Sequence, residues 1–132
     1  MAVFIDTSAI VAFLNPMDEN HQAAADRWTE LVEGEEPLLA TNYILVETFA
    51  VLARRLGFGA VRTFQTLVVP ALAVSWVDQS FHETAVAALL TAGSRDLSLV
   101  DCASFELMRR QGMDTAFAFD AHFIQQGFRC IP

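Results

Sequence analysis

The chain contains no lysine, so all eight of its basic side chains are arginines. Several classes of phosphate-handling protein depend on a lysine, and its absence counts against them. A P-loop enzyme needs one to reach the nucleotide phosphates, and a phosphoaspartate receiver domain needs one beside the phosphorylated aspartate. A haloacid-dehalogenase-type phosphatase would also need an Asp-x-Asp motif, whereas this chain has Asp6-Thr7-Ser8.

Cysteines, targeting signals and long apolar runs are also scarce. The two cysteines, Cys102 and Cys130, have no metal-ligand spacing, so we expect free thiols in a reducing cytoplasm, with a disulfide between them as the less favoured alternative. No basic residue precedes Arg27, so the positively charged start of a secretory signal is missing. The longest uncharged stretch, 63–77, contains Pro70 and is too short for a membrane span. We therefore expect a cytoplasmic protein without a membrane anchor.

Acidic residues are abundant instead, and the formal net charge is −8. Most nucleic-acid-binding proteins are basic, so this balance argues at first sight against a nucleic-acid partner. Bound cations would cancel part of the charge, and an arginine-lined rim can hold a phosphate backbone on an acidic protein. The composition is 54% hydrophobic with 11 phenylalanines, and it predicts one globular domain spanning residues 1–132.

Hydrophobic periodicity and turn residues predict alternating strands and helices. We expect strands at 3–5, 38–40, 73–77, 115–119 and, as an edge strand, 128–131, and helices at about 6–14, 21–32, 41–56, 60–68, 80–90, 98–111 and 121–126. The strands are continuous apolar runs, which indicates a mostly parallel sheet with helices on both faces. The predicted fold is a three-layer α/β/α sandwich.

Four carboxylates each end an apolar run. AVFID ends at Asp6, NYILVE at Glu47, LSLVD at Asp101 and AFAFD at Asp120. A buried unpaired charge is costly, so four such acids predict a common partner that neutralises them. In open parallel sheets ligands bind at the carboxyl ends of the strands, where these acids would meet. Mg²⁺ or Mn²⁺, which take oxygen ligands, would fit this cluster and support metal-assisted phosphodiester chemistry.

Glu47 also has a simpler explanation. It lies in the middle of an apolar stripe of the predicted helix 41–56, where an unpaired acid is rare. The alternative to a site role is a glutamate that extends to solvent or pairs with Arg54 or Arg55 further along the helix. Either way, the residue needs a strong partner.

The other three acids also have simpler explanations, because each lies at or near the start of a predicted helix. Ser98 and Asp101 have the spacing of a capping box, and on local grounds alone we favour capping slightly for Asp101. Asp6 can open the helix that follows it, and Asp120 can act as an N-cap. Separate capping roles do not explain why all four acids are expected at one edge of one sheet, so together they favour a shared site.

The remaining candidates carry weaker signals. His122 could serve as a general base or metal ligand, but we expect a solvent-exposed histidine. His21 and His82 lie on amphipathic helices without metal-ligand spacing, so we interpret them as structural or surface residues. We expect Asp96 to be a loop residue rather than a holder of metal-bound water. Ser8 lacks the Gly-x-Ser-x-Gly setting of a serine hydrolase nucleophile.

Four segments in order make the chain resemble the PIN-domain ribonucleases, and in particular the VapC-like toxins of bacterial type II toxin–antitoxin pairs. They are FIDTSAIVAFL, TNYILVETFAVLARR, LSLVDCASFELMRRQG and AFAFDAHFIQQGF, and they span essentially the whole chain. The resemblance assigns the family's catalytic and metal-binding acids to Asp6, Glu47, Asp101 and Asp120, with no acid missing. It implies a Mg²⁺- or Mn²⁺-dependent endoribonuclease with the α/β/α fold.

The resemblance also implies roles for neighbouring residues. Asp6 and Asp101 would hold one or two cations, with Glu47 and Asp120 bound directly or through water, so that a water attacks the phosphate in line. Thr7 and Ser98 would orient the carboxylates. Arg95, followed by Arg54 and Arg55, are the candidates for contacts with RNA phosphates.

The implied partners are an RNA substrate, a cognate antitoxin that covers the acidic site, and a second copy of the chain in a homodimer. The stretch 56–69, rich in Phe and Val, is either a contact face or plain core. Two other functions stay open: a PIN-like module that binds RNA or protein without cutting, and a structure-specific DNA nuclease. The chain is small and has no helical arch insertion, which favours RNA over DNA as its substrate.

Overall fold

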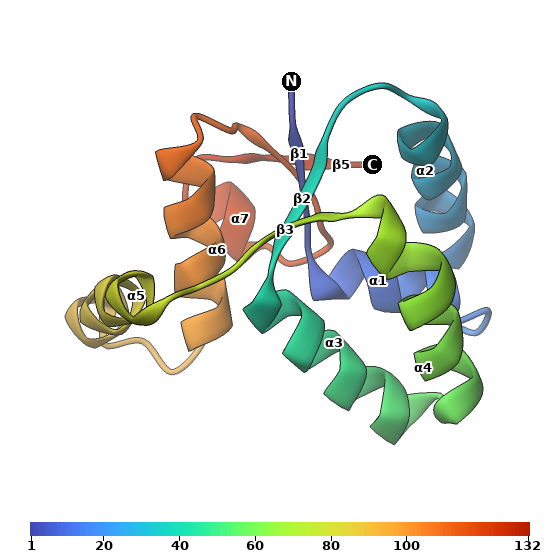
Figure 1. Cartoon of the computed structure of the whole chain (residues 1–132), viewed down its shortest axis with the longest axis horizontal. Helices are drawn as coiled ribbons and strands as arrows, with labels where there is room; N and C mark the ends of the chain where they lie inside the picture. The colour runs from blue at the N-terminus through green and yellow to red at the C-terminus, as the bar shows by residue number, and fades with distance from the viewer.

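Five short parallel strands form a single sheet in the computed structural model, which describes residues 1–132 (Figure 1). The strands are β1 (Val3–Ile5), β2 (Leu38–Thr41), β3 (Ala73–Ser75), β4 (Thr115–Phe117) and β5 (Arg129–Ile131). The helices are α1 (Thr7–Leu14), α2 (His21–Glu33), α3 (Asn42–Arg55), α4 (Phe58–Thr63), α5 (Gln79–Ala92), α6 (Leu99–Arg110) and α7 (His122–Gln125). A π-helical turn, η1 (Phe64–Val68), and a 3₁₀ turn, η2 (Val69–Ala71), follow α4.

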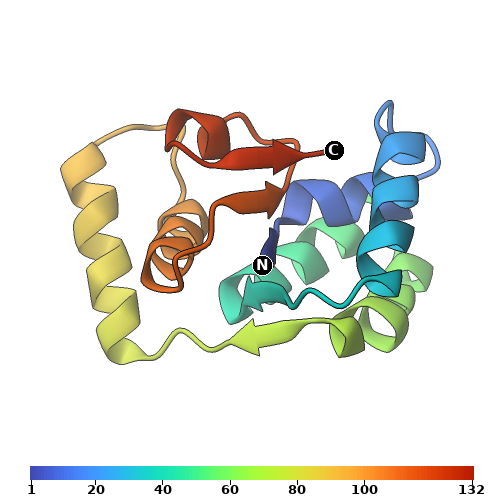
Figure 2. The same cartoon turned by 90° about the horizontal axis from the view of Figure 1, so that it is seen from above.

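The strand order is β3-β2-β1-β4-β5, which puts β1 at the centre of the sheet. The chain winds outward from β1 through β2 to β3, then crosses to β4 and β5 on the other side. Figures 1 and 2 show α5 and α6 on one side of the sheet and α1, α2 and α4 on the other, with α3 running from the carboxyl end of β2. The predicted three-layer α/β/α fold is confirmed, and the sheet is parallel throughout.

The core follows from this topology. The residues of β1 and β4 are buried on both faces, whereas those of the edge strands β3 and β5 are half-buried or exposed. Phe4, Phe117 and Phe123 are fully buried in one cluster of 27 apolar residues. Replacing a buried phenylalanine by alanine typically costs about 3–5 kcal/mol, so this cluster holds the two central strands together.

Two predicted strands are shorter than expected, because backbone N–H groups beyond their ends donate hydrogen bonds to side chains instead of to a neighbouring strand. The strand predicted at 115–119 ends at Phe117, and the N–H of Phe119 donates instead to the hydroxyl of Ser8 at 3.0 Å. The strand predicted at 73–77 ends at Ser75, and the N–H of Val77 donates to Oδ1 of Asn42 at 2.6 Å.

The prediction of one continuous helix at 60–68 is wrong, because this segment contains two types of helix. The segment begins at Phe58 as an α-helix and changes at Phe64 to a π-helical turn, in which the N–H of Val69 donates to the carbonyl of Phe64. The 3₁₀ turn that follows contains Pro70, which has no N–H to continue a helix. Such short π turns are often found at functional sites, although no residue of this one lines the cavity described below.

Both cysteines are free thiols, as predicted, and Cys102 lies in the core. Burial raises the pKa of both thiols, so they are less reactive than an exposed cysteine. No helix has the length and apolar character required to cross a membrane.

Candidate active site

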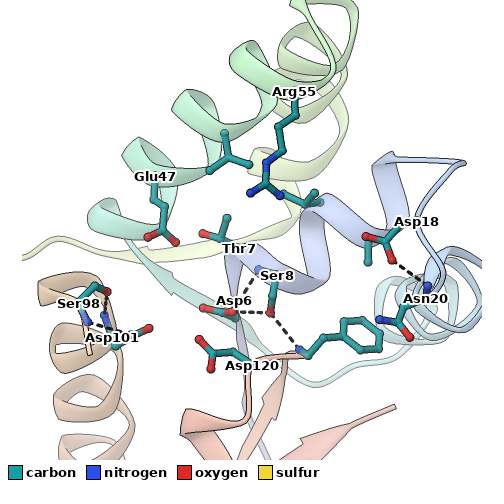
Figure 3. Close-up of a pocket in the computed structure, with 14 residues that line it drawn as sticks. Asp6, Thr7, Ser8, Asp18, Asn20, Glu47, Arg55, Ser98, Asp101 and Asp120 are labelled. Atoms are coloured by element: carbon teal, nitrogen blue, oxygen red, sulfur yellow. Dashed lines mark hydrogen bonds between the residues drawn. The ribbon is translucent and has the colours of Figure 1, made fainter. Parts of the chain in front are cut away.

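A cavity of about 380 Å³ opens beside the carboxyl ends of β1 and β4, and the four predicted acids line it (Figure 3). Each acid comes from a different segment: Asp6 follows β1, Glu47 lies on α3, Asp101 on α6, and Asp120 follows β4. The other lining residues are Thr7, Ser8, Val11, Ala12, Asp18, Asn20, Val51, Arg55, Ser98 and Phe119. The topology therefore brings together acids that are up to 114 positions apart in the sequence.

Asp6 is the most deeply buried of the four, with 4% of its surface exposed. Its Oδ2 accepts hydrogen bonds from the N–H and the hydroxyl of Ser8, at 3.1 and 2.6 Å, so Asp6 is the N-cap of α1. Burial raises the pKa of Asp6 to about 7; the Ser8 hydrogen bonds oppose this rise, and the charges of Glu47 and Asp101 add to it. The predicted capping role and a place in the cavity are both observed, so one does not exclude the other.

Glu47 is half-buried on the face of α3 that borders the cavity. Burial raises its pKa, and the charges of Asp101 and Asp120 contribute to the rise, while the hydroxyl of Thr7 opposes it. Thr7 is held in place by a 3.0 Å hydrogen bond to the hydroxyl of the fully buried Thr48. No ion pair joins Glu47 to Arg54 or Arg55, so the alternative of a simple helix ion pair is not what the structure shows.

Asp101 forms a complete capping box with Ser98. The N–H of Asp101 donates to Ser98 Oγ at 3.0 Å, and the N–H of Ser98 donates to Asp101 Oδ2 at 3.1 Å. Burial raises the pKa of Asp101; the backbone N–H of Ser98 opposes the rise and the charge of Asp120 adds to it. The capping interpretation is therefore correct, and the same carboxylate also lines the cavity.

Asp120 and His122 form a close pair at the start of α7. Asp120 Oδ1 accepts a 2.9 Å hydrogen bond from the backbone N–H of His122 and lies 2.7 Å from its Nδ1 atom. The side chain of His122 is 24% exposed, so the expectation of a solvent-exposed histidine is wrong. One oxygen or nitrogen from each of Asp101, Asp120 and His122 lies within 4.8 Å of the others, a spacing that a single metal ion could bridge.

Only one of the three predicted phosphate-binding arginines lines the cavity. Arg55, at the end of α3, extends into it (Figure 3). Arg54 and Arg95 are exposed and lie outside the lining, so the expectation that Arg95 is the best candidate for a phosphate contact is not supported by its position. Neighbouring residues of a helix point in different directions, so the helix turn separates Arg54 from Arg55.

Three polar lining residues carried no sequence signal for the site: Ser8, Asp18 and Asn20. Asp18 Oδ1 accepts a 2.8 Å hydrogen bond from the N–H of Asn20, an ordinary turn before α2. The sequence pattern of this turn predicts the local backbone structure, but it does not indicate that Asp18 and Asn20 line a cavity. The hydroxyl of Ser8 is marked in the sequence only by its place two residues after Asp6.

The donor set suits a hard divalent cation. Five carboxylates line the cavity, the four predicted acids and Asp18, and Arg55 is the only Lys or Arg side chain in the lining. The pKa values of Asp6, Glu47 and Asp101 are all raised, which means that their charges are not neutralised by the protein alone. Oxygen ligands of this kind are those that Mg²⁺ and Mn²⁺ take.

Comparison with known families decides the classification. The model of the PIN domain matches residues 3–128. The chain belongs to the PIN-domain family. This PIN domain is 34% identical over 128 residues to a Mycobacterium tuberculosis (strain H37Rv) protein named 23S rRNA-specific endonuclease VapC20, and the match covers 96% of this chain and 95% of that protein.

Solved structures agree with the classification. The crystal structure of M. tuberculosis VapC20, described as a sarcin-ricin loop cleaving toxin, superposes on this PIN domain with a TM-score of 0.83 and 31% identity, covering 96% of this chain and 95% of that one. The structure of VapBC2 from Rickettsia felis, bound to a promoter DNA fragment, gives a TM-score of 0.70 at 10% identity, over 98% and 97% of the two chains. FitAcB from Neisseria gonorrhoeae gives 0.69 at 15% identity, over 100% and 97%. The last two similarities show the fold alone.

Proposed function

We propose that this PIN domain is a Mg²⁺- or Mn²⁺-dependent endoribonuclease and the toxin of a toxin–antitoxin pair. The observation that carries the proposal is the convergence of Asp6, Glu47, Asp101 and Asp120 on one cavity at the carboxyl ends of the central strands. Family membership and the 34% identity to a ribosomal RNA endonuclease support the reaction type. Ribosomal RNA is accordingly the first substrate class to test.

The four carboxylates would hold the cation. A bound Mg²⁺ or Mn²⁺ supplies an activated water and stabilises the charge that develops on the phosphate. The hydroxyl of Ser8 holds Asp6, and the backbone N–H of Ser98 holds Asp101. The hydroxyl of Thr7 favours the charged form of Glu47. Fixed carboxylates lose little conformational freedom when the cation binds, which favours a well-defined geometry.

Arg55 would bind the RNA backbone. It is the only Lys or Arg side chain that lines an otherwise acidic cavity, and a guanidinium can contact two phosphate oxygens at once. A phosphodiester beside the four acids would otherwise be repelled by them. Asp18 and Asn20 line the same cavity and would contact the nucleotides that flank the cleaved bond.

The proposed partners are an antitoxin that covers the cavity and a second copy of the chain. Within the stretch 56–69, Phe64 and Val68 are buried in the core, whereas Phe58 and Leu67 are 66% and 71% exposed. Exposed apolar side chains of this size support a contact surface. Size-exclusion chromatography with light scattering measures the oligomeric state directly.

The decisive experiment is cleavage of structured RNA, including 23S rRNA, by the purified protein with Mg²⁺, with Mn²⁺ and with EDTA. Asp6→Asn and Asp101→Asn keep side-chain size, and Asp101→Asn retains an oxygen that can accept the capping bond from Ser98. We expect metal-dependent cuts that both substitutions abolish, while the exposed control Asp26→Asn cuts normally.

Three results would count against the proposal. Cuts that persist unchanged in both site variants would come from a contaminant or another site. A protein that binds the cation and RNA but cuts nothing would instead be the non-cleaving binding module, and cleavage of DNA in preference to RNA would make it a DNA nuclease.

A further inference from the structure

The Nδ1 atom of His122 is in an unusual position for a histidine nitrogen. It is inaccessible to solvent and has no hydrogen-bond partner. Oδ1 of Asp120 lies only 2.7 Å away, yet the two atoms are not aligned for a hydrogen bond. That oxygen already accepts the backbone N–H of His122 at 2.9 Å. The short distance therefore has no explanation in the hydrogen bonding of the protein itself.

The other two histidines differ from His122 in this respect. Nδ1 of His21 is hydrogen-bonded to the carbonyl of Ala12 at 3.0 Å, and Nδ1 of His82 is hydrogen-bonded to the hydroxyl of Tyr43. Each of these nitrogens therefore has a hydrogen-bond partner from the protein. His122 is the one histidine whose Nδ1 has no hydrogen-bond partner.

The spacing of Asp120 and His122 matches two neighbouring ligands of one ion. With metal–ligand bonds of about 2.1 Å, adjacent ligands in an octahedral shell lie about 3 Å apart. Asp101 lies close to this pair, because one carboxylate oxygen from each of Asp101 and Asp120 and one ring nitrogen of His122 lie within 4.8 Å of one another. His122 does not line the cavity itself but adjoins it beside these two acids, which do. The backbone holds this group together, because Phe123 is buried in the core and fixes the start of α7 beside Asp120.

We propose that His122 is a nitrogen ligand of the active-site cation, bound through Nδ1 beside Asp101 and Asp120, and that it makes the site select Mn²⁺ over Mg²⁺. The inference rests on the metal site of the proposed function. Imidazole is a good ligand for transition metals, whereas Mg²⁺ takes oxygen ligands and water. A site with only carboxylates would discriminate less between the two cations.

The competing explanation is that protonated His122 pairs with Asp120 and touches no metal. An ion pair of this kind would also bring the two atoms close together. It would, however, leave no magnetic coupling between a histidine nitrogen and a bound Mn²⁺. It also predicts that His122 affects the binding of Mn²⁺ and Mg²⁺ equally.

The test uses the full chain with Mn²⁺ alone, without RNA, at a pH above the ordinary pKa of histidine. The protein is labelled with ¹⁵N-histidine, and pulsed electron paramagnetic resonance detects nitrogen bound to Mn²⁺. We expect a histidine nitrogen signal in the wild type that is lost in His122→Asn and unchanged in the control His82→Asn. Circular dichroism confirms that each variant is folded.

Calorimetric titration of both cations provides the second measurement. Asparagine places an oxygen near the position of Nδ1, so His122→Asn should still bind Mg²⁺. We expect the ratio of Mn²⁺ to Mg²⁺ affinity to fall on the order of tenfold in this variant and to stay constant in His82→Asn.

The outcomes separate this inference from the proposed function. Mn²⁺ that binds without a nitrogen signal, but is lost in Asp101→Asn, overturns the role of His122 and leaves the metal-dependent nuclease intact. An unchanged affinity ratio in His122→Asn has the same meaning. A wild-type protein that binds no Mn²⁺ overturns both the role of His122 and the metal-dependent mechanism.

Discussion

The hydroxyl of Ser8 donates a 2.6 Å hydrogen bond to Oδ2 of Asp6 and also accepts one of 3.0 Å from the backbone N–H of Phe119. One side chain thus joins the end of the central strand β1 to the segment that leaves β4. The same contact orients the most buried carboxylate of the cavity. Ser8 therefore links the packing of the sheet to the chemistry of the site.

Replacing Ser8 by alanine should affect both properties. Loss of these hydrogen bonds should lower the free energy of unfolding by about 1 kcal/mol. The cation binds the ionised form of Asp6, so we expect activity to rise with pH as Asp6 loses its proton. Since the Ser8 hydroxyl opposes the rise in the pKa of Asp6, its removal should raise this pKa further and shift that increase in activity to higher pH. Chemical denaturation and a pH–rate profile measure the two effects. Ser80→Ala, at an exposed position, is the control, and identical profiles for all three proteins would contradict the prediction.

The metal-free protein should lose stability as the pH rises. Burial raises the pKa of Asp6 from 3.8 to about 7, so between these values the folded state keeps a proton that the unfolded state has released. Glu47 and Asp101 have pKa shifts in the same direction and add to the slope. The contribution of Asp6 is roughly 4 kcal/mol at most, fully present below pH 4 and lost as the pH passes 7.

Chemical denaturation in EDTA at a series of pH values measures this slope. Asp6→Asn cannot ionise, so its stability should vary less with pH and exceed that of the wild type above pH 7. Asp26→Asn, at an exposed position, should keep the wild-type slope. Equal slopes for Asp6→Asn and the wild type would show that Asp6 is not the group responsible.

Divalent cations should reverse this loss of stability. A ligand at one hundred times its dissociation constant stabilises the folded state by about 2.7 kcal/mol. We expect Mn²⁺ or Mg²⁺ to raise the melting temperature more at alkaline than at acidic pH, because protons compete with the cation for the carboxylates. Asp101→Asn should lose most of the gain, since it removes a charged ligand while the capping box can still form. A gain of equal size in this variant would place the bound cation elsewhere.

Arg54 and Arg55 provide a matched pair for testing RNA binding. They are neighbours in the chain and both exposed, but only Arg55 lines the cavity. Arg55→Ala should raise KM for RNA about tenfold, in line with the 1–3 kcal/mol that a charge-assisted contact contributes, and reduce the salt dependence of binding by about one phosphate contact. Arg54→Ala should leave both unchanged. Equal effects of the two substitutions would show that the contribution of Arg55 is general charge rather than a placed contact.

Much of this protein can be predicted from local sequence signals. Apolar runs predict β1, β2 and β4, and the capping residues Thr41 and Ser98 predict where α3 and α6 begin, because such signals act between residues only a few positions apart. The alternation of strands and helices is then sufficient for a parallel three-layer fold. The same logic selects Asp6, Glu47, Asp101 and Asp120 as acids at the ends of apolar runs.

The tertiary structure alone decides which distant segments are in contact and in which directions their side chains point. Ser8 and Phe119 are 111 positions apart, and their hydrogen bond ends β4 two residues before the apolar run does. The choice of Arg55 over Arg95, and the half-buried position of His122 beside Asp120, likewise depend on how helices pack around the sheet. No periodicity within one segment encodes a distance to another segment, because that distance is set by packing of the whole core.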